Sequence, residues 1–232
     1  MLYIVATPIG NLDDMSLRGV AALKAADVIA CEDTRRTRIL LQHFEIARPN
    51  ELLSYREGNE TRTGARIVRA LEEGYTVALC SDGGMPGISD PGYRLVALAV
   101  ERGLELEVIP GASAVPVALV ASGLSTSSYT FKGFPPRKSG AMLRFFEADR
   151  DLPHTMVIFE SPYRVGKSLA AALEALGDRR AAVCIELTKK FERIARGYLS
   201  ELLEQFGDKK VKGEVTIVIA GNNPKFAREE EA

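Results

Sequence analysis

Residues 76–92 read TVALCSDGGMPGISDPG, a short apolar segment that runs directly into a long loop rich in glycine and proline. The segment Thr76–Cys80 has the β-branched, continuously apolar character of a strand buried on both faces of a parallel sheet. In open parallel sheets, ligands bind beyond the carboxyl ends of the strands, and glycine lets the backbone approach a ligand closely. The stretch therefore predicts an α/β fold whose ligand rests on the loop Ser81–Gly92.

The rest of the first half alternates in the same way. Apolar strand-like runs occur at Leu2–Ala6, Val28–Cys31 and Glu105–Ile109. Helical patterns lie between them at Ser16–Ala26, where Ser16 is a suitable N-cap, and at Asn59–Glu73. Strands that alternate with helices indicate a largely parallel sheet covered by helices.

The second half repeats the alternation and predicts a second α/β domain. A chain of 232 residues suits two small cores better than one. The small polar stretch Ser122–Ser128 is a natural boundary, so we expect domains at residues 1–122 and 123–222, followed by a frayed, charged tail at 223–232. Strands are expected at 129–134, 155–160, 181–188 and 214–220, with helices at 140–148, 163–176 and 199–206.

Composition narrows the class of protein. The chain is 46% hydrophobic and 26% charged, as in an ordinary globular protein. Met1 leads into a short apolar run with no basic segment before it, and no apolar stretch approaches the roughly 18 residues of a membrane span, so we expect a cytoplasmic protein with no membrane contact. Cys31, Cys80 and Cys184 sit separately in apolar runs and predict buried thiols. His43 and His154 have no ligands at suitable spacing, so no metal site is expected.

Charge is distributed unevenly along the chain. Up to Leu124 there are 12 lysines and arginines against 16 acidic residues, a net charge of −4. From Ser125 to Asn222 there are 16 against 12, a net charge of +4. The second half should therefore bind an anionic partner better than the first half, although the net charge of a segment can hide a local charged patch.

Three glycine-rich loops follow predicted strands: Thr7–Asn11, Ser81–Gly92 and Pro110–Ala114. Each can offer close backbone contacts, and a following helix adds unpaired N–H donors. The chain has neither GxxxxGK[ST] nor GxGxxG, which disfavours a triphosphate or dinucleotide and favours a ligand without phosphates. The alternative is that glycine and proline merely form tight turns.

Six motifs, in order, cover nearly the whole chain and together resemble the ribosomal RNA small-subunit methyltransferase I family of the tetrapyrrole methylase superfamily. The resemblance implies two α/β domains of tetrapyrrole methylase type, with the methyl donor S-adenosylmethionine in the inter-domain cleft. It also implies a homodimer and 2′-O-methylation of a cytidine of 16S ribosomal RNA in the decoding centre. The motifs are IVATPIGN (4–11), CEDTRRT (31–37), SDGGMPGISDPG (81–92), IPGASA (109–114), FESPYR (159–164) and ELTKKFE (186–192).

The resemblance also implies which residues contact the donor. Members of the family commonly carry Ala at Gly84, His at Tyr163 and Pro at Ala112, and these differences are conservative for donor binding. The donor-binding residues in the first domain are Pro8, Asp82, Gly83, Gly84, Ile88, Ser89, Ser113 and Ala114; those in the second domain are Phe159, Leu187, Gly213 and Thr216, with Glu160 beside them.

Catalysis and RNA binding require further side chains. Methyl transfer to a ribose hydroxyl needs alignment and a base that takes the proton. Asp33 and Glu32, which precede a helix rich in arginines such as Arg35, could supply the base, and the alternative for Asp33 is an N-cap. Glu160 is predicted to orient the acceptor, and the alternative is a structural acid. The predicted catalytic residues are Asp33, Glu160 and Arg35, and the predicted RNA contacts, which could instead be solvated charges, are Arg36, Arg38, Arg137, Lys138, Arg164 and Lys189.

Other functions remain open at this point. A methyltransferase of a corrinoid or porphyrin precursor, or of a translation factor, would share the donor site. A non-catalytic module that binds S-adenosylmethionine is a further alternative. The arginine-rich run Glu32–Thr37 and the basic second half favour small-subunit ribosomal RNA, or the small ribosomal subunit, as the partner.

Overall fold

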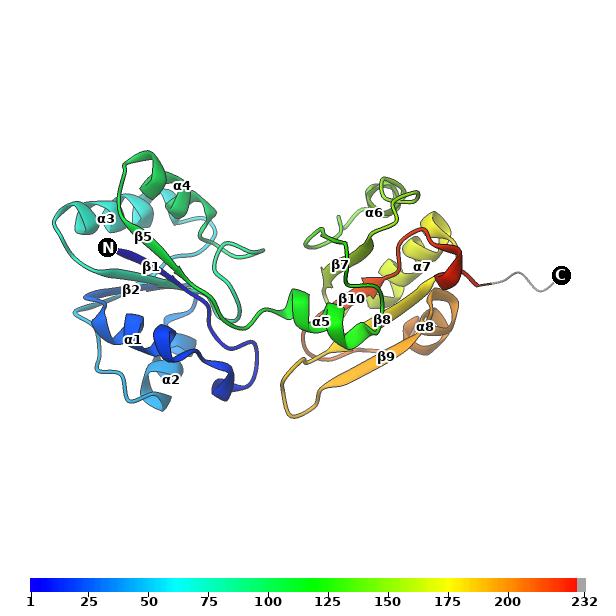
Figure 1. Ribbon diagram of the computed structural model, residues 1–232, viewed down its shortest axis with the longest axis horizontal. Coiled ribbons are helices and arrows are strands. Elements are labelled where there is room, and N and C mark those ends of the chain that lie inside the picture. The colour runs from blue at the N-terminus through cyan, green and yellow to red at the C-terminus, as the bar shows by residue number, and fades with distance from the viewer. Residues whose placement is uncertain (229–232) are drawn as a thin grey trace. The chain divides into compact units, whose positions relative to one another are not determined.

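A computed structural model of the protein describes residues 1–228 and divides into two compact units (Figure 1). The first unit is Met1–Ser113, and the second begins at Ala114. Each unit has its own sheet and its own hydrophobic core, so each is described by itself.

The first unit contains the parallel sheet that the sequence predicts. Its strands stand in the order β3-β2-β4-β1-β5, and every neighbouring pair is parallel. All residues of β2 and β4 are buried, which explains their continuously apolar sequences. The bounds are β1 Leu2–Val5, β2 Val28–Cys31, β3 Glu51–Ser54, β4 Val77–Cys80 and β5 Leu106–Ile109.

Helices cover both faces of this sheet (Figure 1). Helices α1 (Leu17–Ala25) and α2 (Thr34–His43) pack against one face, and α3 (Glu60–Glu72) and α4 (Tyr93–Glu101) pack against the other. Alternate residues of each strand point to opposite faces, so one strand serves both cores. A short 3₁₀ helix, η1, follows β1 at Leu12–Asp14.

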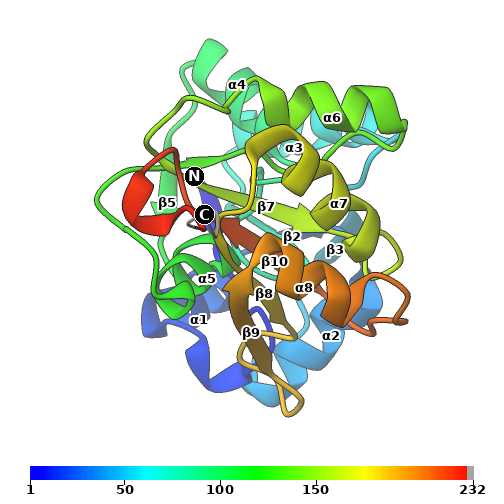
Figure 2. The same ribbon diagram turned by 90° about the vertical axis from the view of Figure 1, so that its right-hand side faces the viewer.

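The second unit has a mixed sheet in the order β6-β7-β10-β8-β9. Figure 2 labels β7, β10, β8 and β9 in this order. β6 and β7 are parallel, whereas β10 runs antiparallel to β7 and β8, and β9 runs antiparallel to β8. The bounds are β6 Tyr129–Phe131, β7 Thr155–Glu160, β8 Arg180–Ile185, β9 Arg193–Tyr198 and β10 Val215–Ile219.

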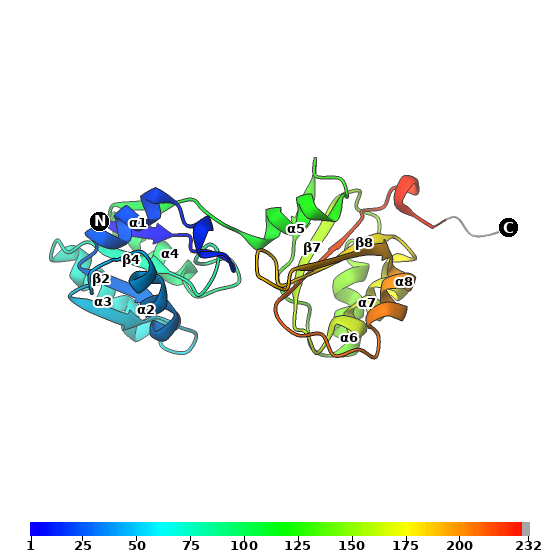
Figure 3. The same ribbon diagram turned by 90° about the horizontal axis from the view of Figure 1, so that it is seen from below.

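Helices also lie on both faces of the second sheet (Figure 3). Helices α6 (Ser139–Glu147), α7 (Val165–Leu176) and α8 (Leu199–Phe206) enclose one core with Ile158, Val183 and Ile217. Helix α5 (Ala114–Ser122) packs against β10, β8 and β7.

Two expected boundaries differ from the structure. The units divide between Ser113 and Ala114 rather than after residue 122, because α5 packs on the second sheet. The expected frayed tail is ordered in its described part: η2 spans Pro224–Phe226, and Arg228 donates to an Asp178 carboxylate oxygen at 3.4 Å. Residues 229–232 of that tail lie outside the described residues.

The three cysteines are free and buried, as predicted. Among the described residues, no three His, Cys, Asp or Glu side chains are grouped so that they could hold a metal ion. No helix in the described part is long and apolar enough to cross a membrane.

Candidate functional site

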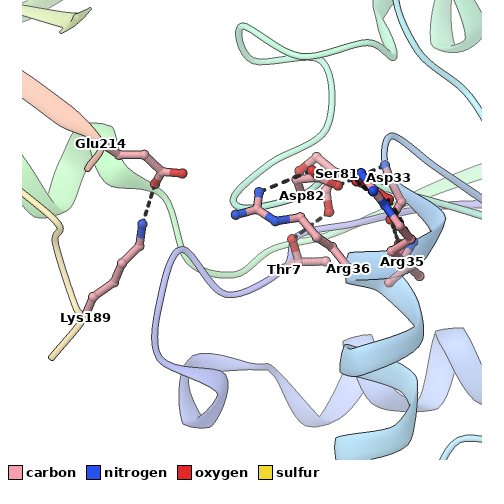
Figure 4. A network of polar contacts seen from close by, with 9 residues as sticks. Thr7, Asp33, Arg35, Arg36, Ser81, Asp82, Lys189 and Glu214 are labelled. Carbon is pink, nitrogen blue, oxygen red and sulfur yellow. Dashed lines mark hydrogen bonds and ion pairs between the residues drawn. The ribbon is translucent and has the colours of Figure 1, made fainter. Parts of the chain in front are cut away.

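The glycine-rich loops after β1 and β4 are joined at the carboxyl edge of the first sheet. The backbones of Thr7 and Gly84 exchange two hydrogen bonds, each 2.9 Å long. The Thr7 hydroxyl also donates to the Ser81 carbonyl at 3.2 Å (Figure 4). Gly84 has a φ of 91°, a conformation that favours glycine. These bonds therefore fix Pro8 and Gly84 in place at the carboxyl edge of the sheet.

The loop after β5 packs against the end of β1 at the same edge of the sheet. A Cβ atom on Gly111 would lie 2.9 Å from the Cβ atom of Ala6, so a larger residue would push this loop away from the end of β1. On the loop after β4, Gly83, Ile88 and Ser89 are exposed, with Ile88 46% exposed. Of the donor-binding residues predicted at this edge, Gly83, Ile88 and Ser89 are exposed, whereas Pro8 and Gly84 are buried. Ser113 ends the first unit, and Ala114 begins the second.

Asp82 ties the second loop to the start of α2. One oxygen of its carboxylate accepts a hydrogen bond from the Asp33 backbone N–H at 3.0 Å. The other oxygen pairs with Nη1 of Arg36 at 3.2 Å (Figure 4). A predicted donor-binding residue and a predicted RNA contact are thus bonded to each other.

Asp33 caps α2. Its Oδ1 accepts from the Arg35 backbone N–H at 2.8 Å, and its Oδ2 pairs with Nη2 of Arg35 at 2.6 Å. Hydrogen bonds from the Arg35 side chain and backbone lower the pKa of Asp33 to about 2. A carboxylate with so low a pKa is a weak base, so the geometry favours the capping role, and the catalytic role of Asp33 and Arg35 stays a prediction.

We expect the variant Arg35→Ala to raise the pKa of Asp33 from about 2 toward its ordinary value, because the side-chain hydrogen bonds that favour the ionised form are lost while the backbone N–H of residue 35 remains. In the wild type the folded pKa is depressed, so the stabilisation from Asp33 is present above the unfolded pKa and is lost as pH falls toward 2. In the variant, the stabilisation from Asp33 should be smaller and should be lost at a higher pH than in the wild type. Carboxyl NMR titration measures this, with exposed Arg38→Ala as the control; an unchanged Asp33 pKa in Arg35→Ala would contradict it.

Glu32 lies beside Asp33 and is the other acid that the sequence offered as a base, although only Asp33 was placed among the predicted catalytic residues. It is half-buried at the end of β2, and burial, followed by the nearby charge of Asp82, raises its pKa. No described residue donates a hydrogen bond to its carboxylate, although its backbone carbonyl accepts from Ser54 at 3.3 Å. The adjacent acids in Cys31-Glu32-Asp33 indicated that a base lies here, but they did not indicate which of the two acids it is.

The second unit gathers its predicted donor-binding residues at one edge of the mixed sheet. Phe159 pairs with Thr216 across β7 and β10. Leu187 follows β8, and Gly213 precedes β10, at the edge where β7 and β8 end. Gly213 has a φ of 92°, and a Cβ atom there would overlap the Glu186 side chain.

Lys189, a predicted RNA contact, is held by two carboxylates beside that edge. Its Nζ lies 3.0 Å from Oε2 of Glu214 (Figure 4). The same Nζ lies 2.8 Å from Oε1 of Glu186. Oε1 of Glu186 also accepts from the Glu214 backbone N–H at 2.8 Å. The lysine therefore closes a structural network, and its role in RNA binding stays a prediction.

Glu160 is buried and its carboxylate is fully engaged. It accepts from the Ser161 backbone N–H at 2.6 Å and from the Ser168 hydroxyl, and it pairs with Nη2 of Arg164 at 2.5 Å. Arg164, whose side chain is 19% exposed, also donates to the Pro135 carbonyl at 3.1 Å. These bonds favour the structural alternative for Glu160 and leave Arg164 little freedom to grip a phosphate.

The other predicted RNA contacts are exposed. Arg36 and Arg38 project from α2, and Arg137 and Lys138 lie on the segment between β6 and α6. The structure thus brings predicted residues together within each unit, while a donor site between the units stays a prediction.

Comparison with known proteins places the chain in a family. The family model of the Tetrapyrrole (Corrin/Porphyrin) Methylases matches residues 1–203. Ribosomal RNA small subunit methyltransferase I of Halalkalibacterium halodurans is 45% identical over 229 residues, which are 99% of this chain and 78% of that protein. The chain belongs to the ribosomal RNA small subunit methyltransferase I family. The Bacillus subtilis member is 41% identical over 231 residues, 100% of this chain and 78% of that protein.

Solved structures confirm the predicted fold of this family. Diphthine synthase aligns with a TM-score of 0.72, covering 94% of this chain and 89% of that chain, at 17% identity. At that identity the likeness shows the fold alone. The protein is thus a methyltransferase of tetrapyrrole methylase type, and the expected donor of this class, S-adenosylmethionine, is confirmed at the level of the family.

Proposed function

We propose that the protein transfers the methyl group of S-adenosylmethionine to the 2′-hydroxyl of a cytidine of 16S ribosomal RNA, in the decoding centre of the small ribosomal subunit. The observation that carries the proposal is the 45% identity to a ribosomal RNA small subunit methyltransferase I across 99% of this chain. We further propose that it acts in the cytoplasm as a homodimer.

The residues at the first sheet edge fit this donor. Its amino group and ribose hydroxyls need carboxylate or carbonyl acceptors, and its carboxylate needs N–H donors. The edge offers the half-buried carboxylates of Glu32 and Asp82 and the exposed backbone of Gly83 and Ser89. When bound, S-adenosylmethionine supplies a methyl group activated on a sulfonium. In the proposal, the loops after β1, β4 and β5 hold it in place, and the second unit's edge closes the site.

A ribose hydroxyl also needs a base. Of the two adjacent acids, Glu32 suits that task better in this structure, because its carboxylate accepts no hydrogen bond from a described residue and its pKa is raised by burial. Asp33 is held ionised by Arg35. The exposed cations Arg36 and Arg38 would then contact phosphates next to the reacting nucleotide.

The test is methyl transfer from labelled S-adenosylmethionine to small-subunit particles, and to free 16S RNA, from cells that lack this activity. We expect label in one nucleotide, with the adjacent phosphodiester resistant to alkali because the 2′-hydroxyl is blocked. Label in a corrinoid precursor, a porphyrin precursor or a translation factor, and never in RNA, would support those alternatives. Donor binding without transfer to any of them would indicate a non-catalytic module.

A further inference from the structure

A groove lined by arginines runs along β3 and α3 of the first unit, and its first cavity includes Ser54 and Arg56 at the carboxyl end of β3. It consists of two cavities of about 470 and about 590 Å³ that share Leu53 and Arg66 in their walls. Arg56 and Arg62 line the first cavity, and Arg69 lines the second. We name this feature, defined by Arg56, Arg62, Arg66 and Arg69, the arginine groove.

Three of these arginines form a row on one side of α3. Arg62, Arg66 and Arg69 are spaced by four and three residues, so they lie on the same side of the helix, about one turn apart. Ile67 and Leu71 are buried under the helix and fix it on the sheet. The row therefore presents a line of cations on a rigid support.

The groove carries more positive charge than its acids neutralise. Arg66 pairs with Glu51, and Glu73 also lines the second cavity. Four arginines against these two glutamates leave a net charge of +2. Among residues 1–228, no ion pair involves Arg56, Arg62 or Arg69, and all three are exposed. Three guanidinium groups are thus available to an anion.

The shape of the groove indicates a long, linear anion. It continues past the first cavity into the second and follows β3, the edge strand of the sheet, which pairs with β2 on one side alone. Guanidinium groups bind phosphate with paired, charge-assisted hydrogen bonds. A nucleic acid backbone repeats one negative charge at every nucleotide, so a row of arginines can follow it.

We infer that the arginine groove binds the sugar-phosphate backbone of the RNA substrate at nucleotides that flank the reacting one. This inference rests on the proposed function and adds a contact in the first unit, whose net charge of −4 up to Leu124 gives no hint of it. A second copy of this chain is a poorer occupant. A two-fold contact through the groove would bring the same four arginines against each other.

The test compares binding of a 16S RNA transcript by the wild type and by the variant Arg56→Gln/Arg62→Gln/Arg69→Gln. Each lost phosphate contact lowers the slope of log affinity against log salt by about 0.7 for single strands. We therefore expect the slope to fall by about 2 and affinity at about 0.1 M salt to fall at least about tenfold. S-adenosylmethionine affinity, measured by calorimetry, and the melting temperature should stay unchanged.

A matched control removes three positive charges from other exposed positions of the same unit: Arg18→Gln/Lys24→Gln/Arg102→Gln. We expect this control to retain most of the RNA affinity and salt slope. If the groove variant binds RNA as the control does while the wild type methylates RNA, the groove inference is wrong and the proposed function stands. If the wild type binds and methylates no RNA in any form, the proposed function fails first, and the groove inference fails with it.

Discussion

The variant Glu160→Ala should lower the free energy of unfolding by about 3 kcal/mol, because it removes one partner of a buried ion pair. The carboxylate is the acceptor for Arg164, the Ser168 hydroxyl and the Ser161 backbone N–H. After the substitution these donors lose their partner. A buried donor left without a partner lowers stability more than the loss of the hydrogen bond alone. Urea unfolding of the wild type and the variant measures the difference.

Three further variants separate the contributions. Ser168→Ala removes one hydrogen bond and should cost about 1 kcal/mol. Glu160→Gln keeps an acceptor of the same shape and should cost less than Glu160→Ala. Glu174→Ala, on the exposed side of α7, should change stability by less than about 0.5 kcal/mol. If Glu160→Ala is as stable as the wild type but loses turnover at unchanged donor affinity, the sequence-based catalytic role is right and the structural role is wrong.

Local sequence patterns predicted the strands that carry a clear run of apolar or β-branched residues, both in the middle of a sheet and at its edge. β2 and β4 are apolar at every position because they lie in the middle of a covered parallel sheet. The edge strands β5 and β6 were predicted, whereas the edge strands β3 and β9 were not, because β3 has a short apolar core of two leucines and Arg193 and Arg196 interrupt the pattern of β9. The antiparallel direction of β10 depends on distant strands, and no local pattern specifies it.

The position of the candidate site was predictable, whereas the state of its side chains was not. Glycine-rich loops after parallel strands indicated the edge where Thr7 and Gly84 now meet. Which acid is free depends on partners brought together by folding: Asp33 is taken by Arg35, and Glu160 by Arg164. The arginine groove was missed for a related reason: the spacing of three arginines on α3 was visible, but the groove they line forms only where α3 lies beside the unpredicted strand β3.

The variant Glu32→Gln should lower the rate constant for methyl transfer by a factor of about 10² to 10⁴, the usual contribution of a positioned base. An amide has nearly the same shape as the carboxylate but cannot take the proton of the ribose hydroxyl. The measurement is single-turnover transfer to small-subunit RNA at saturating S-adenosylmethionine. Donor affinity, measured separately by calorimetry, tests whether the loss comes from binding instead.

The pH profile distinguishes a base from a residue that only shapes the site. Burial raises the pKa of Glu32, so transfer by the wild type should increase with pH through a pKa above the ordinary glutamate value. In the variant Glu32→Gln, this limb of the pH profile, the increase in transfer rate with pH, should be absent. The raised pKa also means that ionised Glu32 opposes folding as pH rises past its unfolded pKa, so the neutral amide should not destabilise the protein at neutral pH.

Asp33→Asn provides the matched comparison, because it neutralises the neighbouring acid. Asp33 is bonded to Arg35 and has a pKa of about 2, so it cannot produce a limb above the ordinary range. If Asp33→Asn removes the limb and Glu32→Gln keeps it, then Arg35 must leave Asp33 when RNA binds, and Asp33 is the base. If both variants keep the wild-type rate and its increase with pH, neither carboxylate accepts the proton. An amide does not titrate, so a variant whose base is replaced by an amide could not keep that pH dependence.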